Sequence, residues 1–196
     1  MRVLARVLTV VAAFVLVSAG TPSALATAEQ QRPGTPPAQR GRRAPIQAMA
    51  LETPAWTDGG RMPAVHTQAG AETSPALRWS PVPEGTVSFV LVAHDVDAPV
   101  GDGTGDTLQW LLWNIPASMT GLPEAVPMAA ELPDGTRQIS QTGPYYRGPG
   151  AMASGTVHHY VFELFALDTM LDVPAVGQSP ADTRGAVMAA MAGHVL

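Results

Sequence analysis

The sequence predicts a mostly antiparallel β fold that ends in a single helix. Three long apolar runs, at residues 87–93, 108–115 and 160–167, have the composition of buried strands. Turns rich in Pro and Gly separate these runs, and proline excludes a helix from most of the connections. The one strong helix signal covers residues 180–195. Strands joined by such turns, with one terminal helix, favour a single β domain.

The first 28 residues have the anatomy of a secretory signal peptide. Arg2 and Arg6 precede an apolar run at 7–17, and small residues in A-x-A patterns follow it. This run is shorter than the ~20 residues that a membrane helix needs, which ranks an uncleaved anchor below a cleaved signal. We therefore expect an exported protein, periplasmic or secreted, with a mature N-terminus near Thr27 or Glu29.

Residues 29–50 are rich in Pro, Gln and Arg and contain no aromatic side chain, which is typical of a disordered linker. Its basic cluster, Arg40, Arg42 and Arg43, would allow a peripheral contact with anionic lipid head groups. Three charges are few for that purpose, so a solvated tail is the favoured interpretation. The remaining residues, 51–196, have the length of one domain.

Charge and cysteine content exclude two classes of protein. Without the signal peptide the chain has nine Arg, no Lys and sixteen acidic residues, a net charge of −7. Such an acidic protein is not a general nucleic-acid binder, because that function needs a basic surface. No cysteine is present, so the exported domain must be stable without disulfides.

The segment before the first long run predicts short strands. Asp58-Gly59-Gly60 is a turn signal, and we expect a short strand on either side of it, with Trp56 and Val65 as core candidates. Further on, apolar and polar residues alternate at 77–79, which indicates another short strand.

The run at 87–93 changes character abruptly at its end. His94, Asp95 and Asp97 follow it, and Ala98-Pro99 should end the strand. Strand alternation places Asp95 and Asp97 on one face and His94 on the other. Polar groups in this position are either a solvated strand end or the rim of a ligand pocket.

The acidic loop that follows, with Asp95, Asp97, Asp102 and Asp106, resembles a calcium loop only loosely. Pro99 stands where a ligand is needed and the closing Glu is missing, so a solvated loop is favoured. The five histidines lack zinc-site spacing, and no G-x-S-x-G, P-loop or dinucleotide fingerprint occurs. We expect no metal and no cofactor.

The later part of the chain supplies further polar groups. Residues 132–150 form a long turn-rich loop, and such loops are often functional. His158 and Tyr160 share one face at the start of the third run. If the strands are neighbours, these side chains, Asp95 and Asp97 converge on a pocket that can hold an anion. Ser179 is placed to N-cap the terminal helix.

Several motifs in their order resemble the phosphatidylethanolamine-binding protein family, the Raf-kinase-inhibitor-like group, and most closely its bacterial branch. They are D-x-D-A-P at 95–99, N-I-P-A at 114–117, G-P-Y-Y-R-G-P at 143–149, H-H-Y at 158–160 and A-L-D-T at 166–169. The resemblance covers most of 74–196. It implies a two-sheet antiparallel β-sandwich with a C-terminal helix and a small pocket for phosphate or phospholipid head groups. Family members are binding proteins, and some inhibit kinases or proteases.

The resemblance also implies a ligand-binding set, which consists of Asp95, Asp97, Gln109, Gly148, His158 and Tyr160. Gln109 stands where the family normally has a pocket His, Val96 replaces a Pro, and residues 150–153 replace a Pro-rich stretch. A neutral amide forms weaker hydrogen bonds to an anion than a charged imidazole does, so phosphate should bind less tightly than in relatives. His158 is then the only cation assigned to the pocket, and affinity should rise as pH falls through the histidine range near ~6.5.

We therefore expect an exported protein without enzymatic activity that binds a small anion or a phospholipid head group. The alternative is an inhibitor that contacts a protease or kinase through its surface, with that enzyme as its partner. A small hydrolase using Asp95 and His158 ranks third, because no nucleophile is evident. Nucleic acid is not an expected partner.

Overall fold

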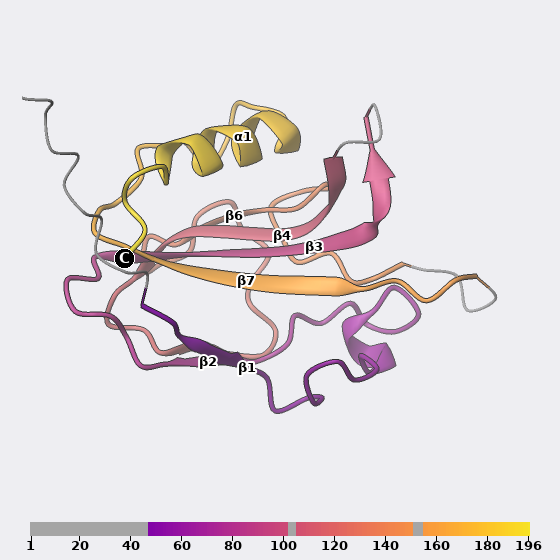
Figure 1. Cartoon of the computed structure of the whole chain (residues 1–196). Helices are drawn as coiled ribbons and strands as arrows, with labels where there is room; N and C mark the ends of the chain where they lie inside the picture. The colour runs from indigo at the N-terminus through magenta and orange to yellow at the C-terminus, as the bar shows by residue number, and fades with distance from the viewer. Residues whose placement is uncertain (1–46, 102–104, 151–154) are drawn as a thin grey trace, which may run out of the picture. The chain divides into compact units, whose positions relative to one another are not determined.

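The computed structural model describes residues 47–101, 105–150 and 155–196 (Figure 1). The predicted signal peptide and residues 29–46 of the predicted linker lie outside this range. The elements, in chain order, are β1 (Ala50–Glu52), the 3₁₀ helix η1 (Ala64–His66), β2 (Leu77–Ser80), β3 (Ser88–Val100), β4 (Gly105–Pro116), β5 (Gly121–Leu122), β6 (Arg137–Ile139), β7 (Tyr160–Leu167) and α1 (Pro180–Ala190).

These strands form two antiparallel sheets. The smaller sheet has the order β1-β2-β5 and the larger β6-β4-β3-β7. The predicted antiparallel two-sheet fold is thereby confirmed, and the three long apolar runs are indeed strands of one sheet. Figure 1 shows α1 on one side of the larger sheet and β1 and β2 on the other.

Alternation along β3 explains why its apolar run is continuous. Phe89, Leu91 and Ala93 belong to the core that faces the smaller sheet, together with Leu77 and Trp79. Val90 and Val92 belong to a second core, which contains Val187 and Met191 at the C-terminal helix. Because β3 is covered on both faces, both sets of side chains have to be apolar.

Helix α1 begins as predicted and ends earlier than predicted. The Ser179 hydroxyl accepts a hydrogen bond from the Asp182 N–H at 3.1 Å, and Pro180 occupies the first turn. The helix stops at Ala190 and not at 195, because Gly193 adopts a φ of +92° that breaks helical geometry. Val195 instead forms an antiparallel bridge with Leu167.

Three other features differ from the predictions. Ordered pairing begins inside the predicted linker, since β1 starts at Ala50 and the Gln47 N–H donates to the Leu196 carbonyl. Residues 51–66 contain one strand and η1 in place of two strands, because prolines at 54 and 63 remove backbone donors. Val65 was predicted to lie in the core, but its side chain is 43% exposed. Strand β3 also continues past Pro99 to Val100, because pairing with β4 resumes after a bulge.

The turn at Asp58-Gly59-Gly60 is present, with Gly59 at a φ of +67°. Trp56 is half-buried. Over the described ranges, no helix has the length and apolar character needed to cross a membrane.

Candidate functional site

A cavity of about 230 Å³ lies where β3, β4 and β7 meet the loop at 140–150. Four of the six predicted ligand-binding residues line it: Asp95, Gln109, His158 and Tyr160. Its other lining residues are Gln68, Ala98, Thr107, Gln141, Arg147 and Gly150.

Strand register explains why these residues meet. Asp95 pairs with Tyr160 of β7 on one side and with Thr107 of β4 on the other. Gln109 lies two residues beyond Thr107, so it is on the same face of β4. The polar end of β3 is thus flanked by polar residues of both neighbouring strands. The result is a polar cavity at the edge of the apolar core.

Asp95 is a buried carboxylate with defined partners. Its Oδ2 lies 2.8 Å from His158 Nδ1, and its Oδ1 accepts a hydrogen bond from the Asp97 N–H at 3.0 Å. The side chain of Asp95 is only 5% exposed, whereas that of His158 is 24% exposed. The His158 ring stacks on Tyr160 with 6.4 Å between centroids. These contacts orient the imidazole and leave its Nε2 as the nitrogen available to a ligand.

Gln109 carries the clearest sign of an incomplete site. Its side chain is buried, and its Oε1 has no hydrogen-bond partner among the residues that the structure describes. A buried polar atom normally has a partner, because leaving it unpaired costs about 1–3 kcal/mol. A donor from outside the chain, supplied by a ligand or by water, would satisfy it.

Arg147 is a cavity residue that the sequence analysis missed. Its guanidinium donates to Gln68 Oε1 at 3.2 Å. Within the described ranges it forms no ion pair with a carboxylate, in contrast to Arg137, which pairs with Glu131, and Arg184, which pairs with Asp106. His158 is therefore not the only cation of this cavity. The available signal was a basic side chain inside a loop already expected to be functional.

Gly148 does not line the cavity. Its N–H donates to Glu72 Oε2 at 3.1 Å, and its carbonyl accepts from Gln68 Nε2 at 2.8 Å. A Cβ on Gly148 would lie 2.8 Å from the His66 carbonyl oxygen. Glycine is needed here for close backbone packing, and its N–H is already bonded to a carboxylate of the chain itself, so the place that the resemblance gives Gly148 in the ligand-binding set is not reproduced.

Asp97 does not line the cavity either. Its Oδ2 accepts the His159 N–H at 2.6 Å and lies 2.7 Å from His159 Nδ1. The backbone hydrogen bond, and then the side-chain one, hold the pKa of Asp97 below its usual value. Asp97 contributes indirectly, because its own N–H donates to Asp95.

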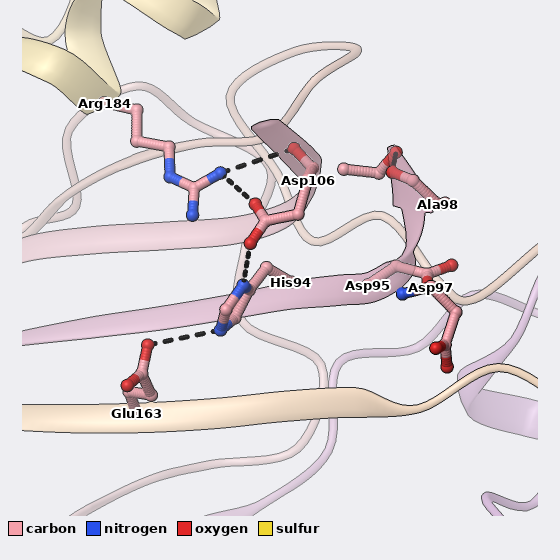
Figure 2. Close-up of polar contacts among 8 residues, drawn as sticks. His94, Asp95, Asp97, Ala98, Asp106, Glu163 and Arg184 are labelled. Carbon is pink, nitrogen blue, oxygen red and sulfur yellow. Dashed lines mark hydrogen bonds and ion pairs between the residues drawn. The ribbon is translucent and has the colours of Figure 1, made fainter. Parts of the chain in front are cut away.

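The opposite face of β3 carries a separate ionic cluster, which Figure 2 shows. His94 Nδ1 lies 2.5 Å from Asp106 Oδ2, and His94 Nε2 lies 3.2 Å from Glu163 Oε2. Arg184 of α1 bonds the other oxygen of Asp106. Burial raises the pKa of Asp106, but the hydrogen bonds from Arg184 and His94 outweigh this effect and lower it overall. His94 and Asp95 therefore occupy opposite faces, as alternation predicts.

The same contacts bear on the calcium alternative. Asp95, Asp97 and Asp106 pair with different partners, which are His158, His159 and Arg184, and Asp102 lies outside the described residues. In the described part of the chain, no three His, Cys, Asp or Glu side chains are grouped to hold a metal ion. The three carboxylates thus serve separate ion pairs.

Comparison with known proteins identifies the family. The family model for phosphatidylethanolamine-binding protein matches residues 52–196, and the chain belongs to this family. A UPF0098 protein from Methanothermobacter thermautotrophicus is 43% identical over 150 residues, which cover 76% of this chain and 92% of the relative. A UPF0098 protein from Aquifex aeolicus is 34% identical over 149 residues, which cover 76% of this chain and 82% of the relative.

Two solved structures share the fold. One is described as a putative phosphatidylethanolamine-binding protein homologue, CT736, from Chlamydia trachomatis. It has a TM-score of 0.61 and 26% identity, over 76% of this chain and 91% of that one. The other is Escherichia coli YbcL, described as a new member of the mammalian phosphatidylethanolamine-binding protein family. It has a TM-score of 0.58 and 30% identity, over 72% of this chain and 90% of that one. Both comparisons confirm the fold that the sequence motifs imply.

Proposed function

We propose that this chain is an exported, non-enzymatic binding protein whose cavity holds a small oxyanion, either free phosphate or the phosphate of a phospholipid head group. The observation that carries the proposal is the juxtaposition of Arg147 and the Asp95–His158 pair in one cavity. Arg147 is not neutralised by a carboxylate of the described residues, so a ligand anion would complete its coordination.

Hydrogen-bonding capacity also supports an anionic ligand. Arg147 and the His158 Nε2 can donate, and the amide of Gln109 offers both a donor and an acceptor. The unpartnered Oε1 of Gln109 suits a ligand that also brings an O–H or N–H group. Phosphoethanolamine combines a phosphate with an ammonium group and therefore matches both requirements.

Catalysis has weaker support than binding. The Asp95–His158 pair resembles the acid–base half of a hydrolase site, but the described residues that line the cavity include neither Ser nor Cys. The hydroxyl of Thr107, a lining residue, already donates to the Ala98 carbonyl at 3.0 Å. We therefore propose that the pair orients a ligand and does not activate a nucleophile.

Calorimetric titration tests the binding proposal. Inorganic phosphate, phosphoethanolamine and phosphocholine are titrated into the full-length chain, and vesicles with and without phosphatidylethanolamine distinguish the head group from free phosphate. We expect phosphoethanolamine to bind more tightly than phosphocholine, which has no N–H group. No binding by any of these compounds would contradict the proposal and favour an inhibitor that acts through its surface.

Export rests on the signal-like N-terminus and has its own test. The chain is expressed in a bacterial host, and the protein outside the cytoplasm is analysed by mass spectrometry. We expect a mature N-terminus near Thr27 or Glu29. Recovery of the chain with Met1 intact would argue against a cleaved signal.

A further inference from the structure

We infer that Arg147 is the residue that sets anion affinity in this cavity, and that its permanent charge lets binding persist at alkaline pH. The inference rests on the proposed function and names the group that governs it. It goes beyond the ligand-binding set that the resemblance implies, because that set contains no arginine.

The backbone places Arg147 beside the residue that departs from the family pattern. The Arg147 N–H donates to the Gln109 carbonyl at 3.0 Å. The 140–150 loop is therefore attached to β4 at the position where a pocket His was expected. Both side chains line the cavity, so a permanent positive charge shares it with the position where a titratable one was expected.

An amide positions the guanidinium of Arg147, and no carboxylate of the described residues neutralises it. Its Nη2 donates to Gln68 Oε1 at 3.2 Å, and Gln68 in turn donates through Nε2 to the Gly148 carbonyl at 2.8 Å. Gln68 therefore orients Arg147 without cancelling its charge. The guanidinium has five N–H donors, so donors remain for a ligand.

The charges around the cavity determine the expected pH dependence. Asp95 on β3 and His158 before β7 form a pair, and Tyr160 on β7 lines the cavity. Outside the lining, Glu72 bonds the Gly148 N–H, and Asp97 pairs with His159. Arg147 is the arginine of this lining, and it keeps its positive charge at alkaline pH.

This arrangement favours a particular class of ligand. A planar guanidinium donates two parallel hydrogen bonds to two oxygens of one oxyanion, which a lysine ammonium cannot reproduce. Phosphate and phosphate esters present such a pair of oxygens. We expect them to bind at alkaline pH with at most a modest loss, because arginine keeps its charge there.

The experiment compares variants at about pH 5.5 and about pH 8.5, on either side of the histidine range. Inorganic phosphate and phosphoethanolamine are titrated into full-length wild type, Arg147→Met, Arg147→Lys and His158→Gln. Arg78→Met is the matched control, since Arg78 is exposed on β2, outside the cavity lining. Thermal unfolding establishes that each variant is folded.

We expect Arg147→Met to weaken binding roughly ten- to a hundredfold at both pH values, the effect of one or two charged hydrogen bonds. Arg147→Lys should lose part of the affinity because it lacks the planar fork. His158→Gln should flatten the pH dependence, and Arg78→Met should resemble wild type.

The outcomes separate this inference from the proposed function. If wild type binds at both pH values and Arg147→Met or Arg147→Lys binds equally well, the role of Arg147 is refuted while the binding function stands. If Arg147→Met fails to fold, Arg147→Lys decides the question in the same way. Absence of binding by wild type refutes the proposed function and this role together.

Discussion

The Arg147 N–H donates to the carbonyl of Gln109 at 3.0 Å, and this bond joins the 140–150 loop to β4 of the larger sheet. Both side chains line the same cavity. The histidine expected at 109 and the arginine found at 147 are alternative ways to supply positive charge. One titrates in the physiological range and the other does not.

Gln109→His should strengthen anion binding at acid pH. The new imidazole would lie in the same cavity as Asp95 and would donate to the anion with charge, where the present amide donates without it. We expect a gain of roughly five- to tenfold at about pH 5.5 and little gain at about pH 8.5. Titration calorimetry with phosphoethanolamine measures both values. Equal affinities of variant and wild type at acid pH would show that position 109 does not contact the anion.

His158→Ala should weaken binding at acid pH and reduce stability as well. The variant removes a hydrogen-bond donor from the cavity and leaves the buried Asp95 carboxylate without its imidazole partner. We expect a loss of roughly tenfold or more in affinity at about pH 5.5, with a smaller effect at about pH 8.5.

His159→Ala is the matched control, because His159 pairs with Asp97 outside the cavity lining and its side chain is 74% exposed. Its affinity for phosphoethanolamine should equal that of wild type. Equal losses in both variants would indicate a general electrostatic effect and not a contact in the cavity.

Strand periodicity was sufficient to predict one part of the site. Alternation along β3 separates His94 from Asp95, and the antiparallel pairing of β3 with β7 brings Asp95 next to Tyr160. These positions follow from a period of two and from neighbouring strands. Strand alternation in the sequence was therefore enough to locate the polar end of β3 in the larger sheet.

The rest of the site depends on loop geometry, which has no period. Gln68 reaches the cavity by bonding Gly148 and Arg147, which are distant in sequence. The resemblance places Gly148 in the ligand-binding set, but its N–H donates to the carboxylate of Glu72. Contacts of this kind are set by tertiary packing, so a single sequence does not reveal them.

Gly148→Ala should destabilise the fold through packing. The added methyl group would lie 2.8 Å from the His66 carbonyl oxygen and 2.9 Å from two Thr67 backbone atoms, so the backbone has to move. Overpacking of this kind costs about 1–3 kcal/mol. Urea unfolding of the variant and wild type measures the difference.

Gly185→Ala is the matched control for this substitution. Gly185 lies within α1, and a Cβ there meets nothing within 4 Å. The same change should stabilise the protein by about 0.5–1 kcal/mol, because alanine favours a helix. Destabilisation of both variants to the same extent would contradict the packing argument at Gly148.

Asp106→Asn should weaken the contact between α1 and the larger sheet and remove part of the acid sensitivity of the protein. Asp106 accepts from Arg184 of α1 through one oxygen and contacts His94 through the other (Figure 2). The side chains of Asp106 and Arg184 are each 25% exposed, so these contacts are only partly screened by solvent. At neutral pH we expect a loss of about 1–3 kcal/mol in the free energy of unfolding.

The pH dependence follows from the direction of the Asp106 pKa. Because the folded protein lowers this pKa below its ordinary value of 3.8, the carboxylate stabilises the fold fully above that value. This contribution disappears as pH falls through the lowered pKa, where folded protein takes up the proton. Urea unfolding at neutral pH and below about pH 3 should therefore show wild type and Asp106→Asn converging at acid pH. A constant difference between them at both pH values would show that the carboxylate charge is not what stabilises the helix contact.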